Sequence, residues 1–219
     1  MRLKALCVGG AALAALVLPL TPASATPGDM VTTTLTQAIA DLPVTAESRD
    51  GYERSKFRHW VDVDHDGCAT RAEVLEEEAV EPPDVGPRCK ITGGSWFSWY
   101  DGRLVDGPTS LDIDHKVPLA EAWDSGASAW TAQERQDYAN DLGEPRALDA
   151  VSAQQNRQKA DQDPTTWMPS DPSAHCRYIA DWAAVKTRWR LSADPDEVAA
   201  LQRIAVRCPD EEITVVLAR

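Results

Sequence analysis

Two aspartates and a histidine stand close together in the segment SLDIDHKVPL, which covers residues 110–119. Asp114 directly precedes His115, inside a run of alternating apolar residues that predicts a β-strand. This pairing suits the hydrolysis of phosphodiesters, because a carboxylate can hold Mg²⁺ or a similar cation while a neutral imidazole takes the proton from attacking water. Successive side chains of a regular strand point to opposite faces, so we expect the strand to end or bulge here.

A second polar group follows about forty residues later. Ser152 and the segment AQQNRQKA predict a capped helix, on which Asn156 and Lys159 are three residues apart and share a face. The segment RALDAV before it predicts a short strand. Further upstream, Thr131 and Glu134 form a capping-box pattern that opens an inserted helix. The predicted order is therefore strand, inserted helix, strand, helix.

The segments DHKVPL and VSAQQNRQKADQDPTTWMP, in that order and separated by a short strand, resemble the HNH endonucleases. The likeness is greatest to a secreted actinobacterial branch related to the GmrSD-type HNH domain, and it covers residues 71–169. It implies an α+β fold with a ββα-metal core over about residues 95–169 and additional helices around it.

The resemblance also implies roles for individual residues. His115 would be the general base, and Asp114 and Asn156 would be the ligands of one divalent cation. Lys159 would contact the phosphate or the leaving group. Arg71, in the segment Cys68-Ala-Thr-Arg71, matches a CxTR segment of this branch, and we expect its guanidinium to clamp a phosphate.

The sequence departs from the HNH pattern at one position. An asparagine commonly ties the loop about nine residues before the final ligand, and here that position is Ala147. Either Asn140 substitutes from the inserted segment, or packing alone holds the loop. The final ligand is an asparagine rather than a histidine, and an oxygen-rich site favours Mg²⁺ or Mn²⁺ over zinc.

A second cluster of acids fits the pattern of an EF-hand calcium loop. Asp62, Asp64 and Asp66 alternate, Gly67 follows for a sharp turn, and Glu73 occupies the twelfth position. The sequence contains no second copy, although EF-hands normally pair, and Cys68 lies inside the loop. We keep two interpretations open: a Ca²⁺ site, or an acidic turn that supports Arg71.

The N-terminus has the features of a secretory signal peptide over residues 1–25. Two basic residues precede an apolar run from Ala5 to Leu20, and Ala23-Ser-Ala25 supplies a cleavage site. We expect a secreted, extracellular protein that begins near Thr26. No later stretch approaches the roughly 20 apolar residues that a membrane span needs, so we expect no membrane partner.

Cleavage would leave four cysteines in an oxidising environment, which predicts two disulfides. Cys176 precedes one amphipathic helix and Cys208 ends another. The ends of an antiparallel pair of helices over residues 174–208 would bring these two cysteines together. That argument favours Cys176 with Cys208 and leaves Cys68 with Cys89.

The length suits one domain over residues 46–219, after a leader at residues 26–45 that contains one short helix from Leu35 to Leu42. The net charge of -13 repels anionic polymers at long range. Nucleic acid chemistry would therefore need a local basic cluster and a bound cation.

These observations lead to one hypothesis and two alternatives. The hypothesis is a secreted, monomeric, metal-dependent endonuclease that cuts DNA, and RNA as a second substrate, with low sequence specificity, because no recognition helix or zinc finger is apparent. One alternative is a secreted calcium-binding interaction module, with the Asp-His pair inert. The other is a metal-assisted phosphoesterase that acts on small substrates.

Overall fold

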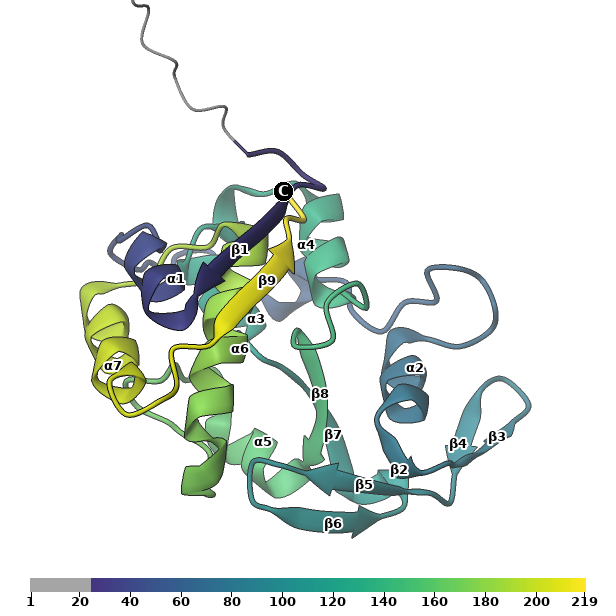
Figure 1. The fold of residues 1–219 in the computed structure, drawn as a ribbon. Helices are drawn as coiled ribbons and strands as arrows, with labels where there is room; N and C mark the ends of the chain where they lie inside the picture. The colour runs from purple at the N-terminus through teal and green to yellow at the C-terminus, as the bar shows by residue number, and fades with distance from the viewer. Residues whose placement is uncertain (1–24) are drawn as a thin grey trace, which may run out of the picture.

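The computed structural model describes residues 25–219, so the predicted signal peptide lies outside the described residues except for Ala25. These residues form helices and small antiparallel sheets, which confirms the expected α+β class (Figure 1). None of the helices among residues 25–219 is both long enough and apolar enough to cross a bilayer.

The first and last strands of the described chain lie side by side (Figure 1). Strand β1 (Met30–Thr34) pairs antiparallel with β9 (Glu212–Val216). Helix α1 (Leu35–Asp41) follows at once, capped by the hydroxyl of Thr34, and buries one apolar face. The predicted short helix is therefore present, but residues 26–45 belong to the fold and are not a separate leader. Strand β1 pairs with β9, which is distant in the sequence. Local sequence patterns therefore did not reveal that residues 26–45 join the fold.

A group of short elements follows. The 3₁₀ turn η1 (Arg54–Lys56) leads to helix α2 (Thr70–Glu77). Strands β2 (Ala79–Glu81), β5 (Ser95–Ser98) and β6 (Arg103–Asp106) form one sheet in the order β2-β5-β6, and β3 (Asp84–Gly86) pairs with β4 (Lys90–Thr92). The buried indole of Trp96 donates to the carbonyl of Leu75 at 2.7 Å, which joins this sheet to α2.

A pair of antiparallel strands occupies the middle of the molecule (Figure 1). The turn η2 (Pro108–Ser110) precedes β7 (Leu111–His115), which pairs with β8 (Leu148–Ser152). Helices α3 (Leu119–Asp124) and α4 (Ala132–Ala139), with the turn η3 (Ala127–Ala129), are inserted between the strands. Helix α5 (Ala153–Lys159) follows β8 directly, and Ser152 caps it as predicted.

The C-terminal part contains the predicted pair of helices. After the turn η4 (Pro172–Ala174) come α6 (His175–Trp189) and α7 (Pro195–Ala205). The disulfides are Cys176 with Cys208 and Cys68 with Cys89, so both predicted pairings are confirmed.

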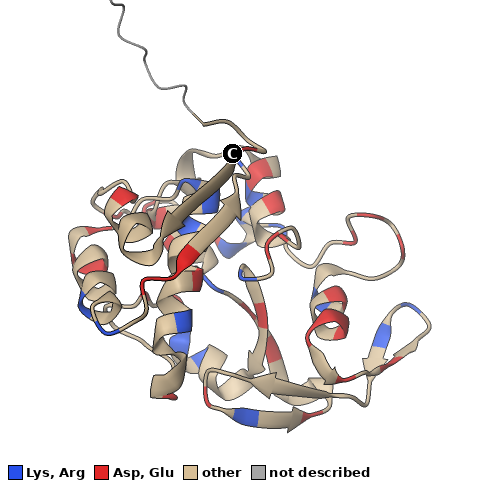
Figure 2. Cartoon of the chain, viewed as in Figure 1, with Lys and Arg blue, Asp and Glu red and all other residues tan. Residues whose placement is uncertain are grey.

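Helix α6 contributes a large part of the core, which also contains residues from α1, α7 and β9. Acidic side chains are spread over most of the elements, with a group on α2 (Figure 2). The core residues of α6 with the lowest exposure are Tyr178, Ile179, Trp182, Ala183 and Ala184.

Candidate active site

His115 is the last residue of β7 and is buried, with 7% of its surface exposed. Its Nε2 lies 3.0 Å from the carbonyl oxygen of Ala139, at the end of the inserted helix α4. A carbonyl can only accept, so Nε2 carries the proton and Nδ1 is left as an acceptor. Nδ1 has no hydrogen bond within residues 25–219. The ring also packs against Trp60, with the two centroids 5.4 Å apart.

The surroundings of His115 keep its imidazole neutral. Burial is the main cause that lowers the pKa of His115 to about 3, and the positive charge of Arg54 acts in the same direction. The hydrogen bond to Ala139 acts in the opposite direction and is the weaker effect. The imidazole is therefore a free base at neutral pH, which is the form that accepts a proton from water.

The carboxylate of Asp114 accepts hydrogen bonds from Lys159 and Tyr100, and the sequence did not indicate this role for either residue. Lys159 on α5 donates to both carboxylate oxygens at 2.7 and 2.6 Å, and to the carbonyl of His115 at 2.7 Å. The hydroxyl of Tyr100 donates to Oδ2 at 2.5 Å. Burial raises the pKa of the Asp114 carboxyl, and the ammonium of Lys159 opposes this rise.

The predicted phosphate contact from Lys159 does not agree with this geometry. Its side chain is completely buried, and its ammonium group is surrounded by the three acceptors of Asp114 and His115. A phosphate in solvent cannot reach it. Lys159 instead fixes the end of β7 against α5.

Asp114, His115 and Asn156 line a single cavity of about 270 Å³. Asn156 is half-buried, and its Nδ2 makes only a long contact of 3.4 Å with Asp112. Its Oδ1 accepts no hydrogen bond within the described chain. The cavity therefore presents a carboxylate, an amide oxygen and an imidazole nitrogen together. Its other lining residues are Arg54, Ile113, Pro118, Leu119, Arg157, Ala160 and Asp161.

Arg71 does not line this cavity. Its guanidinium donates to the carbonyl of Leu111 at 3.1 Å, and its side chain lines a neighbouring cavity beside Trp60. The cations that border the cavity with His115 are instead Arg54 and Arg157. Sequence reasoning missed Arg54 because it lies about 60 residues before His115 and belongs to no recognisable motif.

Asn140 has the tying role that was one of the two alternatives from the sequence. Its side chain accepts from the backbone of Val61 and the hydroxyl of Thr70, and donates to the carbonyls of Arg58 and Gln136. Asn140 directly follows Ala139, whose carbonyl holds His115. These four bonds therefore fix the segment that orients the imidazole.

The predicted calcium loop also brings its acids together. One carboxylate oxygen from each of Asp62, Asp64 and Asp66 lies within 4.8 Å of the others. The amide of Gly67 donates to Oδ2 of Asp62 at 3.1 Å, and Gly67 has a φ of +99°, which favours glycine. Oδ1 of Asp62 and Oε2 of Glu73 are buried without a hydrogen-bond partner in residues 25–219. Burial and the three aspartates raise the pKa of Glu73.

Comparison with known proteins adds independent information. The family model of the GmrSD restriction endonucleases, C-terminal domain, matches residues 89–204, which is more than half of the chain. The chain belongs to this family. The stretch that matches the GmrSD C-terminal domain contains β7, β8 and α5, and hence His115 and Asn156. It does not contain Arg71 or the acids of the predicted calcium loop.

A relative from Arthroderma benhamiae supports the same grouping. It is named an uncharacterized secreted protein and is 38% identical over 201 residues, which cover 90% of this chain and 97% of that protein. No solved structure matches the chain. The GmrSD family is thus established, while the expected actinobacterial origin stays a prediction.

Proposed function

We propose that this protein is a secreted, metal-dependent endonuclease that hydrolyses phosphodiester bonds of DNA, and of RNA as a second substrate, with low sequence specificity. The observation that carries the proposal is the cavity shared by Asp114, His115 and Asn156, in which the imidazole is held as a neutral base. Membership of the GmrSD family supports a nuclease. The signal-peptide pattern and the name of the Arthroderma benhamiae relative support secretion.

The unit formed by β7, β8 and α5 serves, in this proposal, as the ββα-metal core of an HNH nuclease. Two antiparallel strands and the helix that follows them are the elements such a core requires. The strands place Asp114 and His115 at the end of β7, and the helix brings Asn156 to the same cavity. Helices α3 and α4 form the insertion, and α4 provides the carbonyl that orients His115.

His115 acts as the general base in the proposed reaction. Its Nδ1 accepts the proton of a water molecule, and the oxygen of that water attacks the phosphorus atom. The bond from phosphorus to the leaving sugar oxygen breaks at the same time, and that oxygen takes a proton from solvent water. The hydrogen bond from Nε2 to Ala139 fixes the ring and stabilises the imidazolium that forms. Arg54 and Arg157 border the cavity, where their guanidinium groups can bind the phosphate oxygens.

The donor set of the cavity fits a hard divalent cation. The carboxylate of Asp114 and the free Oδ1 of Asn156 are both oxygen ligands, which Mg²⁺ and Mn²⁺ prefer. Such a cation, when bound, stabilises the negative charge that develops on the phosphate and on the leaving oxygen. Lys159 and Tyr100 hold the carboxylate of Asp114 in place for this ligation.

A plasmid-nicking assay tests the proposal. We expect the protein to cut plasmid DNA, EDTA to stop the cutting, and added Mg²⁺ or Mn²⁺ to restore it. His115→Ala should lower the rate by about 10² to 10⁴ through loss of the base. His175→Ala is the matched control, because His175 is bonded to the carbonyl of Pro169 and does not line the cavity. Equal rates for His115→Ala and the unchanged protein would refute the assigned base.

The same preparations also test the alternative of a small-substrate phosphoesterase. A model diester such as bis(4-nitrophenyl) phosphate reports this activity. Hydrolysis of the model diester without any cutting of plasmid DNA or RNA would replace the endonuclease proposal. Cutting of plasmid DNA that depends on His115 excludes this alternative as the main activity.

We further propose that the loop from Asp62 to Glu73 binds one Ca²⁺ as a structural ion. Support comes from the convergence of the three aspartates and from the buried, unpartnered oxygens of Asp62 and Glu73. Helix α2 begins at Thr70, inside the loop, as the exit helix of an EF-hand does. Only the short turn η1 precedes the loop, and the disulfide of Cys68 with Cys89 anchors it instead.

Calcium binding at this loop is measured by titration with Ca²⁺ while the melting temperature is recorded. We expect Asp62→Asn to weaken the stabilisation by Ca²⁺, since it removes a charged ligand. Asp84→Asn is a suitable control, because Asp84 lies on β3 outside the cluster. A response to Ca²⁺ that is the same in both variants would contradict the loop site.

A further inference from the structure

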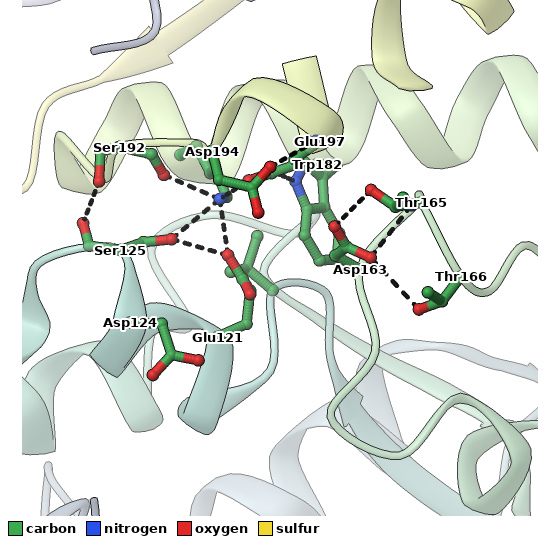
Figure 3. A network of polar contacts seen from close by, with 12 residues as sticks. Glu121, Asp124, Ser125, Asp163, Thr165, Thr166, Trp182, Ser192, Asp194 and Glu197 are labelled. Atoms are coloured by element: carbon green, nitrogen blue, oxygen red, sulfur yellow. Dashed lines mark hydrogen bonds and ion pairs between the residues drawn. The ribbon is translucent and has the colours of Figure 1, made fainter. Parts of the chain in front are cut away.

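A second group of acids lies where the segment before η1 meets helix α3. One carboxylate oxygen from each of Glu47, Glu121 and Asp124 lies within 4.8 Å of the others. Glu121 and Asp124 are three residues apart on α3, a spacing that makes them neighbours on the helix surface (Figure 3). Glu47 belongs to the irregular segment that leads from α1 to η1 and is exposed to solvent.

One carboxylate oxygen of Asp124 lacks a hydrogen-bond partner in the described part of the chain. Its side chain is only 3% exposed. Arg49 donates from Nε to Oδ2 of Asp124 at 2.6 Å, and Nη2 of Arg49 lies 2.5 Å from the same oxygen. Oδ1 is buried without a hydrogen bond to any of residues 25–219. A buried carboxylate oxygen without a partner is costly, so this atom is available to a ligand.

The second acid, Glu121, is 2% exposed, and only one of its two carboxylate oxygens accepts hydrogen bonds from the described residues. Its Oε1 accepts from Lys186 at 2.8 Å and from Ser125 at 2.7 Å. Its Oε2 has no hydrogen bond within the described chain. Glu121 and Asp124 therefore each have one oxygen in use and one free oxygen.

Negative charge exceeds positive charge around these acids. The ammonium of Lys186 donates to Glu121 at 2.8 Å and to Glu197 at 2.6 Å. Asp194, the N-cap of α7, lies close to Glu197 (Figure 3). Two cations, Lys186 and Arg49, thus lie among six carboxylates, which belong to Glu47, Glu121, Asp124, Asp161, Asp194 and Glu197. Glu121, Glu197 and the side chain of Asp124 are buried, and an excess of buried negative charge is unfavourable unless a further cation or a proton joins it.

We propose that Glu47, Glu121 and Asp124 form a binding site for one Ca²⁺ ion, separate from the cavity of His115 and from the loop of Asp62. Calcium ligands lie about 2.3 to 2.6 Å from the ion, so two oxygens on opposite sides are about 5 Å apart. The observed spacing within 4.8 Å matches that requirement without movement of the backbone. Waters would complete the coordination on the exposed side, next to Glu47.

The proposed ion would join the segment of Glu47 to helix α3. Helix α3 begins four residues after His115, so this link supports the part of the chain that directly follows the strand β7. Arg49, from the same segment, also reaches Asp161 at 4.0 Å, and Asp161 lines the cavity of His115. The site is thus placed to stabilise one wall of that cavity.

The experiment counts bound Ca²⁺ in a protein without its other two candidate cation sites. The background variant combines Asp62→Asn, Asp64→Asn and Asn156→Ala, and equilibrium dialysis against ⁴⁵Ca²⁺ gives the stoichiometry. We expect the background variant to bind one Ca²⁺ per chain. Addition of Glu47→Gln should weaken this binding at least about tenfold, because affinity follows the number of charged ligands.

The variant Glu53→Gln is the matched control, because Glu53 lies on the same segment and its side chain is 68% exposed. It should leave the affinity of the background variant unchanged. Glu47 is exposed too, so its replacement keeps the fold, which circular dichroism verifies. Absence of binding in the background variant, or binding that Glu47→Gln does not weaken, would overturn the proposal. A Glu47→Gln variant that melts higher at pH 8 without any response to Ca²⁺ would also overturn it, in favour of a shared proton.

Discussion

A single buried ammonium holds the carboxylate that the proposed cation requires. Lys159 and Asp114 are both removed from solvent, and within residues 25–219 neither forms an ion pair with any other residue. Desolvation lowers the pKa of Lys159, while the carboxylate of Asp114 opposes that effect. Each of these two charges compensates the other, because removal of either residue would leave the remaining charge buried without a counter-charge.

Lys159→Met should therefore lower the free energy of unfolding by about 3 to 5 kcal/mol, as expected for the loss of one partner of a buried ion pair. Urea unfolding measures the change. Arg157→Met is the control on the same helix, because its side chain is 75% exposed, and it should cost less than about 1 kcal/mol. Similar losses in the two variants would show that the contact of Lys159 with Asp114 contributes little.

Glu78 couples the stability of the fold to pH. Its carboxylate accepts from the amide of Ala150, and burial, with repulsion from Asp149, raises its pKa to about 8. The folded chain therefore keeps a proton on Glu78 that the unfolded chain loses near pH 4.5. Stability from this group is present at low pH and is lost as the pH rises towards 8.

Glu78→Gln should remove this contribution. We expect the variant to match the parent protein near pH 5 and to become the more stable of the two as the pH rises to 8, by at most on the order of 1 kcal/mol per pH unit. Urea unfolding at pH 5, 6.5 and 8 in EDTA gives the comparison. A difference between the two proteins that does not vary with pH would contradict the argument.

The chemistry of the individual site residues was only partly predictable. The convergence of Asp114, His115 and Asn156 on one cavity was predicted because two short motifs carry them, and their catalytic roles stay predictions. The burial of Lys159 disagrees with a phosphate contact and was not predictable, because burial depends on packing between distant segments. Arg71 lines a neighbouring cavity, and its phosphate contact stays a prediction. Tyr100 and Arg54 gave no signal, since neither has a spacing that links it to His115.

At the scale of elements, sequence patterns at helix N-termini predicted correctly where two helices begin. The predicted capping box of Thr131 and Glu134 is present, and so is the cap of α5 at Ser152. The strands β1 and β9 were missed, because each is stabilised by the other across nearly the whole chain. Pairing between strands so far apart in the sequence cannot be predicted from a short segment of either strand.

The disulfide of Cys176 with Cys208 ties the start of α6 to the end of α7 across 32 residues. The double variant Cys176→Ser, Cys208→Ser should lose about 3 to 4 kcal/mol of stability, because the cross-link restricts the unfolded chain. Thermal and urea unfolding of the oxidised parent and the double variant measure this. Unchanged stability would mean that the packing of α6 on α7 suffices without the bond.

At the scale of the whole molecule, the two-stranded sheet of β1 and β9 covers part of the core. Val215 points inward and is 2% exposed, whereas its neighbour Val216 is 45% exposed. Val215→Ala should cost about 2 kcal/mol through the cavity it leaves. Val216→Ala changes the same residue type in the same strand and should cost less than about 0.5 kcal/mol. Equal effects on the melting temperature would show that β9 adds little to the core.

The net charge is also a property of the whole molecule that bears on nucleic acid binding. The net charge of -13 opposes binding of nucleic acid at long range, so the proposed reaction would depend on local cations such as Arg54 and Arg157, which line the cavity of His115. The class of fold and the family were within reach of the sequence. The positions of the acids around Glu121 were not, because three separate segments bring them together.

The pairing of β1 with β9 has a consequence for synthesis. Residues 30–34 have no partner in this sheet until residues 212–216 have been synthesised, so the sheet cannot form while the residues between the two strands are being made. Contacts of such large sequence separation form slowly. We therefore expect this sheet to form late in folding, and helix α1, which directly follows β1, lacks the support of the sheet until then.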